Sequence, residues 1–460
     1  MTTQPTIDLA RASAAETALA VRTGAISALE ACDAAIARIE KGDREINAVV
    51  VRDFDRARAA AKRVDAQRAK GANDRQHHPL MGVPMTVKES NDVAGLPTTW
   101  GMAAFKDLAI KEDAVAVARL KDAGAVILGK TNAPVALADW QAVNPVYGRT
   151  LNPHDHARSP GGSSGGAAAA VAARMVSLEL GSDIGGSIRV PAHMCGVFGH
   201  KPTYGIVPLK GHGFPGTDGA EVPIAAVGPI ARTAEDLEIA LDAMAGPLPG
   251  VGMKLDLKPA RHANLKDHRV LVLDEHPACK TASAVRDALN NLAGALDEAG
   301  ADVVRKVDGL PDLAKAHAAY GQMLIAITTR GAPGAKPIDA HAWMELIDEQ
   351  YRLMRAWAHV FKDVDVVLTP PFGVPAFPHD DNPNWGERTL MIDGAKTPYG
   401  VQVAWPGVAT FPNLPATAAP IAKTKEGLPI GVQIMAGAYE DRTSLMFAKL
   451  LQQVGLTAAT

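Results

Sequence analysis

Two serines flanked by glycines are the residues most able to attack a carbonyl carbon. Ser163 lies within Gly161–Gly166 (GGSSGG), and Ser187 ends the run Asp183–Ser187 (DIGGS). Glycine adopts backbone conformations that other residues resist, and it lets a substrate come close to backbone N–H groups. Because a free serine hydroxyl is a weak nucleophile, either serine needs a base beside it.

Lys88 is the candidate base. It ends the apolar run Gly82–Lys88 (GVPMTVK), which is typical of a buried strand. A lysine acts as a base only when it is neutral, so its ordinary pKa of ~10.4 has to fall by ~2–3 units. Burial at the end of an apolar strand disfavours the charged form and lowers the pKa in this way. The alternative is an ordinary charged lysine that pairs with a nearby acid such as Glu89 or Asp92.

These motifs, in this order, resemble those of the amidase signature family of serine hydrolases, which use a Ser–cisSer–Lys triad. Ser163 follows Lys88 by 75 residues and Ser187 follows Ser163 by 24, in agreement with the family pattern. The resemblance implies that Ser187 is the nucleophile and Lys88 the base. It also implies that Ser163 follows a cis peptide bond and relays protons between them. Ser164 is an alternative relay, although the spacing favours Ser163.

The resemblance further implies an oxyanion hole in the turn before the nucleophile. Its donors would be the backbone N–H groups of Ile184, Gly185, Gly186 and Ser187. One donor aimed at the negative oxygen of a tetrahedral intermediate is worth ~3–4 kcal/mol. A glycine-rich turn without such a role is the alternative. Asp183 and Arg189 flank this turn, and we expect them to brace it.

Two stretches are expected to form the substrate pocket. By family resemblance, Ala138, Asp139 and Trp140 lie near the acyl part of the substrate. Residues 310–405 depart from the regular pattern of the chain and carry four of its six tryptophans. They include the irregular stretch 370–406, rich in Pro, Gly, Asn and Asp. Long irregular loops are often functional, so we expect a wall or lid over the site, with ordinary aromatic packing as the alternative.

Three glycine patterns suggest other functions but lie in the wrong context. Residues 124–131 match the phosphate-loop pattern GxxxxGKT, yet the four middle residues indicate an apolar strand. Residues 211–216 match GxGxxG, but no helix follows them. Residues 161–165 match GxSxG of the α/β-hydrolases, which requires a strand directly before it. A Ser-Asp-His esterase using a histidine such as His379 is the second hypothesis, and an amidotransferase-type subunit that needs a partner is the third.

Composition favours a globular protein outside the nucleic-acid and membrane classes. The chain has 460 residues, 47% of them hydrophobic, and a net charge of −3, so no nucleic-acid or anionic-membrane partner is implied. Its three cysteines, Cys32, Cys195 and Cys279, indicate a reducing compartment. We expect a cytoplasmic protein, because no signal segment and no apolar run of ~18 residues is visible. No metal-binding motif is present, and a homodimer is common in the family.

Strands and helices alternate along the chain, which favours an α/β fold. We expect an α/β/α sandwich around a large mixed β-sheet, as in the amidase signature family. The expected strands are 83–87, 125–128, 177–180, 270–273, 302–304, 364–368 and 430–435. The expected helices are 8–22, 27–41, 52–69, 113–123, 165–174, 233–245, 282–299, 313–330, 340–361 and 442–454. We expect one domain, 1–460, with a helical N-terminal cap (1–75), a catalytic core (76–250) and a substrate-pocket insertion (310–405).

The motifs together predict a hydrolase that cleaves carbon–nitrogen bonds of linear amides through a serine acyl-enzyme. The resemblance runs from about residue 82 to 246 and is weaker near 411–436. It implies a small-molecule amide or carbamate substrate and no metal or organic cofactor. Primary amides, aryl amides and urethanes all remain open, because the same chemistry acts on each. The tryptophans and the lack of a basic cluster favour a neutral, apolar or aromatic group.

Overall fold

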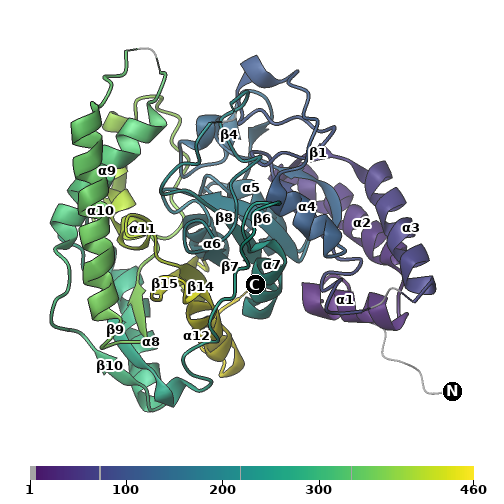
Figure 1. Cartoon of the computed structure of the whole chain (residues 1–460). Coiled ribbons are helices and arrows are strands. Elements are labelled where there is room, and N and C mark those ends of the chain that lie inside the picture. Colours follow the sequence, from purple (N-terminus) through teal and green to yellow (C-terminus); the bar gives the residue numbers. More distant parts are fainter. Residues whose placement is uncertain (1–6, 72–73, 218, 333, 460) are drawn as a thin grey trace.

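A mixed β-sheet of 11 strands forms the middle of the molecule (Figure 1). The computed structural model describes residues 7–71, 74–217, 219–332 and 334–459. Parts of the predicted domain and of its three segments fall on the remaining positions, which lie outside the described residues. The strand order is β1-β3-β2-β6-β8-β7-β14-β15-β11-β9-β10. The predicted mixed sheet is therefore confirmed.

Parallel and antiparallel pairs alternate in blocks across this sheet. The strands are β1 (Val49–Arg52), β2 (Pro84–Lys88), β3 (Val126–Thr131), β6 (Leu178–Asp183), β7 (Phe198–Lys201), β8 (Ala226–Ala231), β9 (Arg269–Val272), β10 (Asp302–Val304), β11 (Val366–Thr369), β14 (Ala416–Lys423) and β15 (Pro429–Met435). β2 pairs in parallel with β3 and β6, and β9 pairs in parallel with β10 and β11. The other pairs of the sheet are antiparallel. Two short hairpins, β4–β5 (Val143–Asn144, Gly148–Arg149) and β12–β13 (Thr389–Ile392, Ala395–Pro398), lie outside it.

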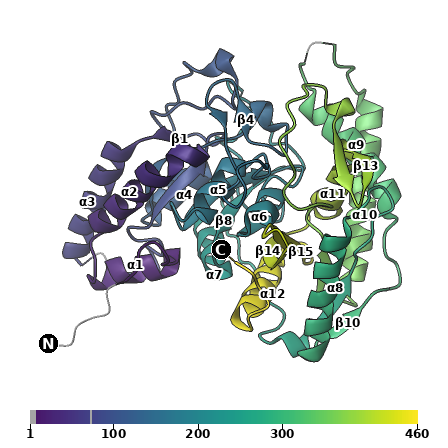
Figure 2. The same ribbon diagram turned by 180° about the vertical axis from the view of Figure 1, so that it is seen from behind.

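Helices cover both faces of the sheet and complete a three-layer sandwich. One face packs against α1 (Ala14–Thr23), α4 (Val115–Asp122), α7 (Ala234–Met244), α8 (Ser283–Glu298) and α12 (Asp441–Gln453). The other face packs against α2 (Ala28–Ile46), α3 (Phe54–Ala69), α5 (Gly165–Ala172), α6 (Arg189–Cys195), α9 (Leu313–Thr328), α10 (Ala340–Val360) and α11 (Ala404–Thr410). In the two views, α2 and α3 lie at one end of the molecule, and α9 and α10 lie at the other (Figures 1 and 2).

The predicted elements are mostly present, with corrections at their ends. The predicted N-cap Ser27 forms a full capping box with Glu30 at the start of α2. α1 begins at Ala14 rather than residue 8, because Ser13 and Glu16 form a second capping box there. β1 occupies residues up to Arg52, where a helix was expected to start. β7, β8 and β14 were not predicted, and part of the stretch expected to be irregular forms the β12–β13 hairpin and α11.

The sheet brings the two ends of the predicted site to one edge. β2 and β6 are adjacent and parallel, so Lys88 at the end of β2 lies near Asp183 at the end of β6. The segment before α5 reaches the same edge, because α5 is wholly buried and rich in alanine, which lets it lie close to the sheet. Two positions tolerate only glycine: a Cβ on Gly162 would overlap the carbonyl oxygen of Asp139, and one on Gly166 would overlap the backbone of Asn132.

Candidate active site

Lys88 lies fully buried at the centre of the site. Its Nζ donates to the Oγ of Ser163 at 2.6 Å and to the Oγ of Ser182 at 2.9 Å. Burial lowers the pKa of Lys88 to about 7, although the negative charges of Asp183 and Glu179 oppose this shift. At neutral pH a large fraction of the lysine is therefore an uncharged amine, which is the form that accepts a proton.

The structure does not pair Lys88 with Glu89, one of the two acids named for the alternative of an ordinary charged lysine. The Glu89 carboxylate accepts the backbone N–H and the hydroxyl of Thr99 at 2.7 and 2.8 Å. It also accepts the N–H of Trp100 at 3.0 Å and the hydroxyl of Tyr147 at 3.1 Å. These donors surround Glu89, and none of them is Lys88. The carboxylate thus organises the loop after β2 and does not hold the lysine in its charged form.

Ser163 rather than Ser164 is in contact with the lysine. The peptide bond between Gly162 and Ser163 is cis, as the family resemblance implied. The hydroxyl of Ser164 faces away, because it donates to the carbonyl oxygen of Ser182 at 3.2 Å and accepts the N–H of Ser182 at 3.3 Å. The backbone N–H of Ser164 donates to the carbonyl oxygen of Ser187 at 3.1 Å. This bond ties the segment of Ser163 directly to the turn that carries Ser187.

The turn before Ser187 is organised by a buried carboxylate. Asp183 accepts the N–H of Gly186 at 2.9 Å and the N–H of Ile188 at 3.0 Å. It also forms an ion pair of 2.7 Å with Arg189, in which both side chains are completely buried. Burial alone would raise the pKa of Asp183, but the Arg189 charge and these hydrogen bonds lower it to about 2. The expected bracing of the turn by Asp183 and Arg189 is present in the structure.

This arrangement narrows the predicted set of oxyanion donors. The N–H of Gly186 is used by Asp183 and does not point at an open position, contrary to the set of donors expected. The N–H groups of Ile184, Gly185 and Ser187 are not among those that Asp183 binds. These three remain as candidate donors for an oxyanion. Gly186 leaves the predicted set because the turn folds back over Asp183 and brings the Gly186 N–H within hydrogen-bonding distance of its carboxylate.

The predicted substrate segment lies against the same turn, but its three residues differ in role. Ala138 is exposed. The carboxylate of Asp139 is held by Arg388 at 2.6 Å and by the hydroxyl of Tyr399 at 2.8 Å. Trp140 is buried, and its indole Nε1 donates to the carbonyl oxygen of Gly185 at 2.9 Å. Asp139 therefore links this segment to the 310–405 region, whereas Trp140 contacts the turn that carries the nucleophile.

Aromatic rings from the 310–405 region pack around Trp140. Its ring centroid lies 4.9 Å from that of Phe372, 5.4 Å from that of Trp385 and 5.1 Å from that of Tyr399. We call these four residues the aromatic cluster. The cluster lies beside the candidate nucleophile turn because of the bond from Trp140 to Gly185.

Two residues of the site escaped the sequence reasoning. Ser182, the second partner of Lys88, lies one residue before the motif that begins at Asp183, and only a polar residue at the end of a buried strand marks it. The hydroxyl of Tyr320 donates to the carbonyl oxygen of Ile184 at 2.6 Å, across 136 residues of sequence. No local pattern in the sequence distinguishes Tyr320.

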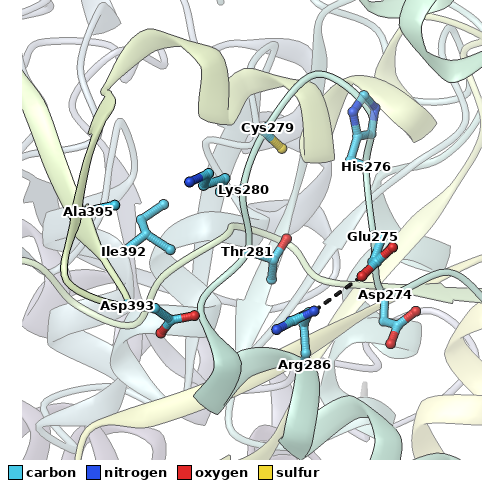
Figure 3. A pocket seen from close by; sticks show the side chains of 10 residues that line it. All are labelled: Asp274, Glu275, His276, Cys279, Lys280, Thr281, Arg286, Ile392, Asp393 and Ala395. Atoms are coloured by element: carbon cyan, nitrogen blue, oxygen red, sulfur yellow. Dashed lines mark hydrogen bonds and ion pairs between the residues drawn. The ribbon is translucent and has the colours of Figure 1, made fainter.

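A cavity of about 340 Å³ lies away from the three candidate residues (Figure 3). It is lined by residues 274–276 and 279–281, by Arg286 of α8 and by Ile392, Asp393 and Ala395 of the β12–β13 hairpin. Arg286 and Glu275 point toward each other there and form an ion pair of 3.2 Å. Lys88, Ser163 and Ser187 are not part of its lining, so this cavity is separate from the candidate active site.

The competing motifs do not form the sites that they suggest. Residues 126–131 of the phosphate-loop pattern form the fully buried strand β3. His379, the histidine considered for an esterase triad, contacts Arg149 through Nδ1 at 3.0 Å and the carbonyl oxygen of His156 through Nε2 at 3.2 Å. Both ring nitrogens are therefore used outside the serine site. In the described part of the chain, no helix combines the length and the apolarity needed to span a bilayer.

Comparisons with known proteins agree with this geometry. The family model described as Amidase matches residues 30–332 and 326–445. The indoleacetamide hydrolase of Bradyrhizobium diazoefficiens is 34% identical, over 96% of this chain and 86% of that protein. Human fatty-acid amide hydrolase 2 is 30% identical, over 94% of this chain and 87% of that protein.

A similar fold has also been solved. One solved structure is described as a vestigial protein complex that reveals the evolutionary origins of an s-triazine catabolic enzyme. It superimposes on this chain with a TM-score of 0.83. It is 30% identical in sequence, and the superposition covers 98% of this chain and 100% of that chain. The similarity thus extends from the motifs around the serines to the complete sheet and its helices.

Proposed function

Since the chain belongs to the Amidase family and is an amide hydrolase, we propose that it forms an acyl-enzyme on Ser187. Ser163 relays protons, and Lys88 is the base. The observation that supports this most strongly is the buried 2.6 Å hydrogen bond from Lys88 to Ser163, formed by a lysine whose pKa is lowered to about 7 by burial. A charged, exposed lysine could not accept a proton at neutral pH.

The reaction proceeds in two halves. Ser187 Oγ attacks the amide carbonyl carbon, its proton passes to the Oγ of Ser163, and the proton of Ser163 passes to Nζ of Lys88. The oxyanion that forms accepts hydrogen bonds from the N–H groups that Asp183 leaves open. As the C–N bond breaks, the proton returns through Ser163 to the leaving nitrogen, and an amine or ammonia departs. Water then attacks the ester, gives its proton to the same relay and releases the acid.

Ser182 gives Lys88 a second fixed partner. A neutral amine has two N–H donors and one lone pair. When Lys88 is the neutral base, its N–H bond to Ser182 orients the amine, and its lone pair accepts the proton of Ser163 across the same 2.6 Å contact over which Nζ otherwise donates. Because the distance from Nζ to Ser182 Oγ is 2.9 Å, we assign Ser182 the role of positioning the base.

The rate is expected to fall as the pH drops through about 7. Lys88 must be neutral to accept a proton, and burial lowers its pKa to about 7, so acid converts it to the inactive ammonium. Below this pH, kcat/KM should decrease about tenfold per pH unit. The measurement is a kcat/KM profile from pH 5 to 9 on one amide substrate. A rate independent of pH between 5 and 9 would contradict the role of Lys88.

Glu179→Gln is the matched control for this profile. Glu179 is fully buried, and burial raises its pKa to about 8, so this carboxyl also titrates near neutrality. A carboxyl with this pKa is largely neutral below pH 8, so it adds little negative charge beside Lys88 where kcat/KM falls. The variant should therefore keep the decrease in kcat/KM at low pH, close to its wild-type position. If kcat/KM of Glu179→Gln no longer decreased at low pH, the titration would belong to the carboxyl instead of the lysine.

The substrate is proposed to be an amide with an aromatic or apolar acyl group. The aromatic cluster beside the nucleophile turn is apolar, and its Trp385 is 36% exposed. We propose that residues 310–405 form the wall of the pocket. The relatives include an enzyme named for indoleacetamide and one named for fatty-acid amides, both with apolar acyl groups. We expect a primary arylacetamide to be hydrolysed with a kcat/KM at least ~10-fold above that of acetamide. A panel of arylacetamide, acetamide, a nitroanilide and an aryl carbamate measures this, and equal rates for the first two would exclude an apolar pocket.

A further inference from the structure

Two aromatic side chains hold the carbonyl groups of the turn before Ser187. The hydroxyl of Tyr320, on α9, donates to the carbonyl oxygen of Ile184 at 2.6 Å. The indole Nε1 of Trp140 donates to the carbonyl oxygen of Gly185 at 2.9 Å. Tyr320 is completely buried and Trp140 is 4% exposed. These two bonds act on neighbouring peptide groups. Trp140 precedes the turn in the sequence, whereas Tyr320 follows it.

The planarity of the peptide bond converts these contacts into an orientation of N–H groups. In a trans peptide, the C=O of one residue and the N–H of the next point in opposite directions. The bond to the Ile184 carbonyl therefore fixes the direction of the Gly185 N–H. The bond to the Gly185 carbonyl likewise fixes the direction of the Gly186 N–H, which itself donates to Asp183 at 2.9 Å. Glycine would otherwise leave these peptide groups free to rotate.

Both donors are themselves held in place by packing. A Cβ on Gly407 would lie 2.6 Å from Cδ1 of Tyr320, so only glycine there leaves room for the phenol ring. Phe411 packs against the same ring with centroids 6.0 Å apart. Burial raises the pKa of Tyr320, so the phenol keeps its proton and stays a donor. The ring of Trp140 is fixed within the aromatic cluster.

We propose that Tyr320 and Trp140 are positioning residues: Tyr320 holds the peptide group that carries the Gly185 N–H, and Trp140 holds the next peptide group, so that the turn keeps the Gly185 N–H directed at the oxyanion of the tetrahedral intermediate. This inference rests on the proposed acyl-enzyme mechanism. It assigns to the 310–405 region, through Tyr320, a part in the stabilisation of the transition state in addition to the walls of the pocket. It also assigns Trp140 to the catalytic turn rather than to contact with the acyl group alone.

The test removes each donor and keeps an aromatic ring at each position. Tyr320→Phe and Trp140→Phe are expected to lower kcat by ~10–100-fold each, with KM changed less than about threefold, because a misdirected donor weakens only the transition state. Affinity for a trifluoromethyl ketone, which adds to the serine and places an oxyanion in the same position, should fall by the same factor as kcat/KM. A merely structural role would not produce this proportional loss.

A matched control variant and a separate outcome test the inference further. Tyr439→Phe, at a tyrosine that is 56% exposed and lies outside residues 310–405, should leave kcat within about twofold of wild type. A folded Tyr320→Phe with unchanged kcat, or with reduced kcat but unchanged ketone affinity, would overturn the role of Tyr320, and the same outcomes apply to Trp140→Phe. If Ser187→Ala retained full activity, the proposed acyl-enzyme mechanism would be wrong. If Ser187→Ala were inactive and Tyr320→Phe fully active, only the positioning role of Tyr320 would be wrong.

Discussion

Ser187→Ala is expected to lower kcat by at least ~10⁴-fold, the largest effect of any single substitution in this chain. In the proposed mechanism the serine hydroxyl forms the covalent bond, and the hydrogen bond that the Ser187 carbonyl accepts from Ser164 at 3.1 Å does not depend on the side chain. The fold and the turn should therefore survive, and only the chemistry should be lost. The measurement is the initial rate on an arylacetamide together with labelling by a fluorophosphonate probe, followed by mass spectrometry of the intact protein.

The labelling experiment separates the nucleophile from its neighbours. Ser187→Ala should take up no probe, whereas Ser27→Ala, which changes the N-cap of α2 far from the site, should be labelled as wild type. Ser163→Ala keeps the nucleophile but breaks the relay, so it should be labelled slowly. Stoichiometric labelling of Ser187→Ala would mean that another serine attacks the substrate.

Lys88→Met is expected to remove at least ~10³-fold of kcat without lowering the stability of the fold. Burial moves the pKa of Lys88 from 10.5 to about 7, which corresponds to a penalty on the order of 5 kcal/mol for the buried ammonium. Methionine is similar in length and avoids this penalty. Loss of the two hydrogen bonds to Ser163 and Ser182 offsets part of the gain, at ~1 kcal/mol each. The measurements are kcat and the free energy of unfolding in urea at pH 7.

The pH dependence of stability checks the same prediction independently. Because the pKa of Lys88 is lower in the folded chain than its ordinary 10.5, the unfolded chain binds more protons between pH 7 and 10. This contribution makes wild-type stability increase with pH across that window. Lys88→Met lacks it, so its advantage over wild type should be greatest at pH 7 and shrink toward pH 10. A variant less stable than wild type at pH 7 would contradict a strongly buried charge at this position.

Lys130→Met is the control for both measurements. Lys130 is also fully buried, and burial lowers its pKa to about 8. Its Nζ donates to the hydroxyl of Thr98 at 2.8 Å and to the carbonyl oxygen of Pro97 at 2.5 Å, not to a serine. The variant should therefore keep most of the turnover of wild type. Equal loss of activity in both variants would show that burying a lysine, rather than placing it beside Ser163, is what matters.

The sequence alone predicted the parts of the site that lie in contiguous motifs. The contact between Lys88 and Ser163 was implied by the family resemblance, and the bracing of the turn by Asp183 and Arg189 was expected from their places beside it. Each of these residues belongs to a short run whose glycines or apolar neighbours mark it. The α/β/α architecture followed from the alternation of strands and helices.

Two of the strands that were missed share a physical reason. β8 reads AVGPIA and β14 reads ATAAPIAK, and their glycine, proline and alanine have low intrinsic strand propensity. They are strands because their neighbours in the sheet supply the pairing. Tyr320 was missed for a similar reason, since its contact with Ile184 crosses 136 residues and depends on the packing of α9. Long-range contacts of this kind leave no periodic trace in the sequence.

The groups that hold Arg189 come from the C-terminal part of the chain, and this has a consequence for biosynthesis. Its guanidinium donates to the carbonyl oxygen of Pro406 at 2.9 Å and to the hydroxyl of Thr410 at 2.7 Å, and it contacts the side chain of Gln433. When the ribosome has synthesised only the first half of the chain, Lys88, Ser163 and Ser187 are already present but none of these three contacts can form. The contacts that hold Arg189, and with it the turn before Ser187, are therefore complete only after synthesis has passed Gln433.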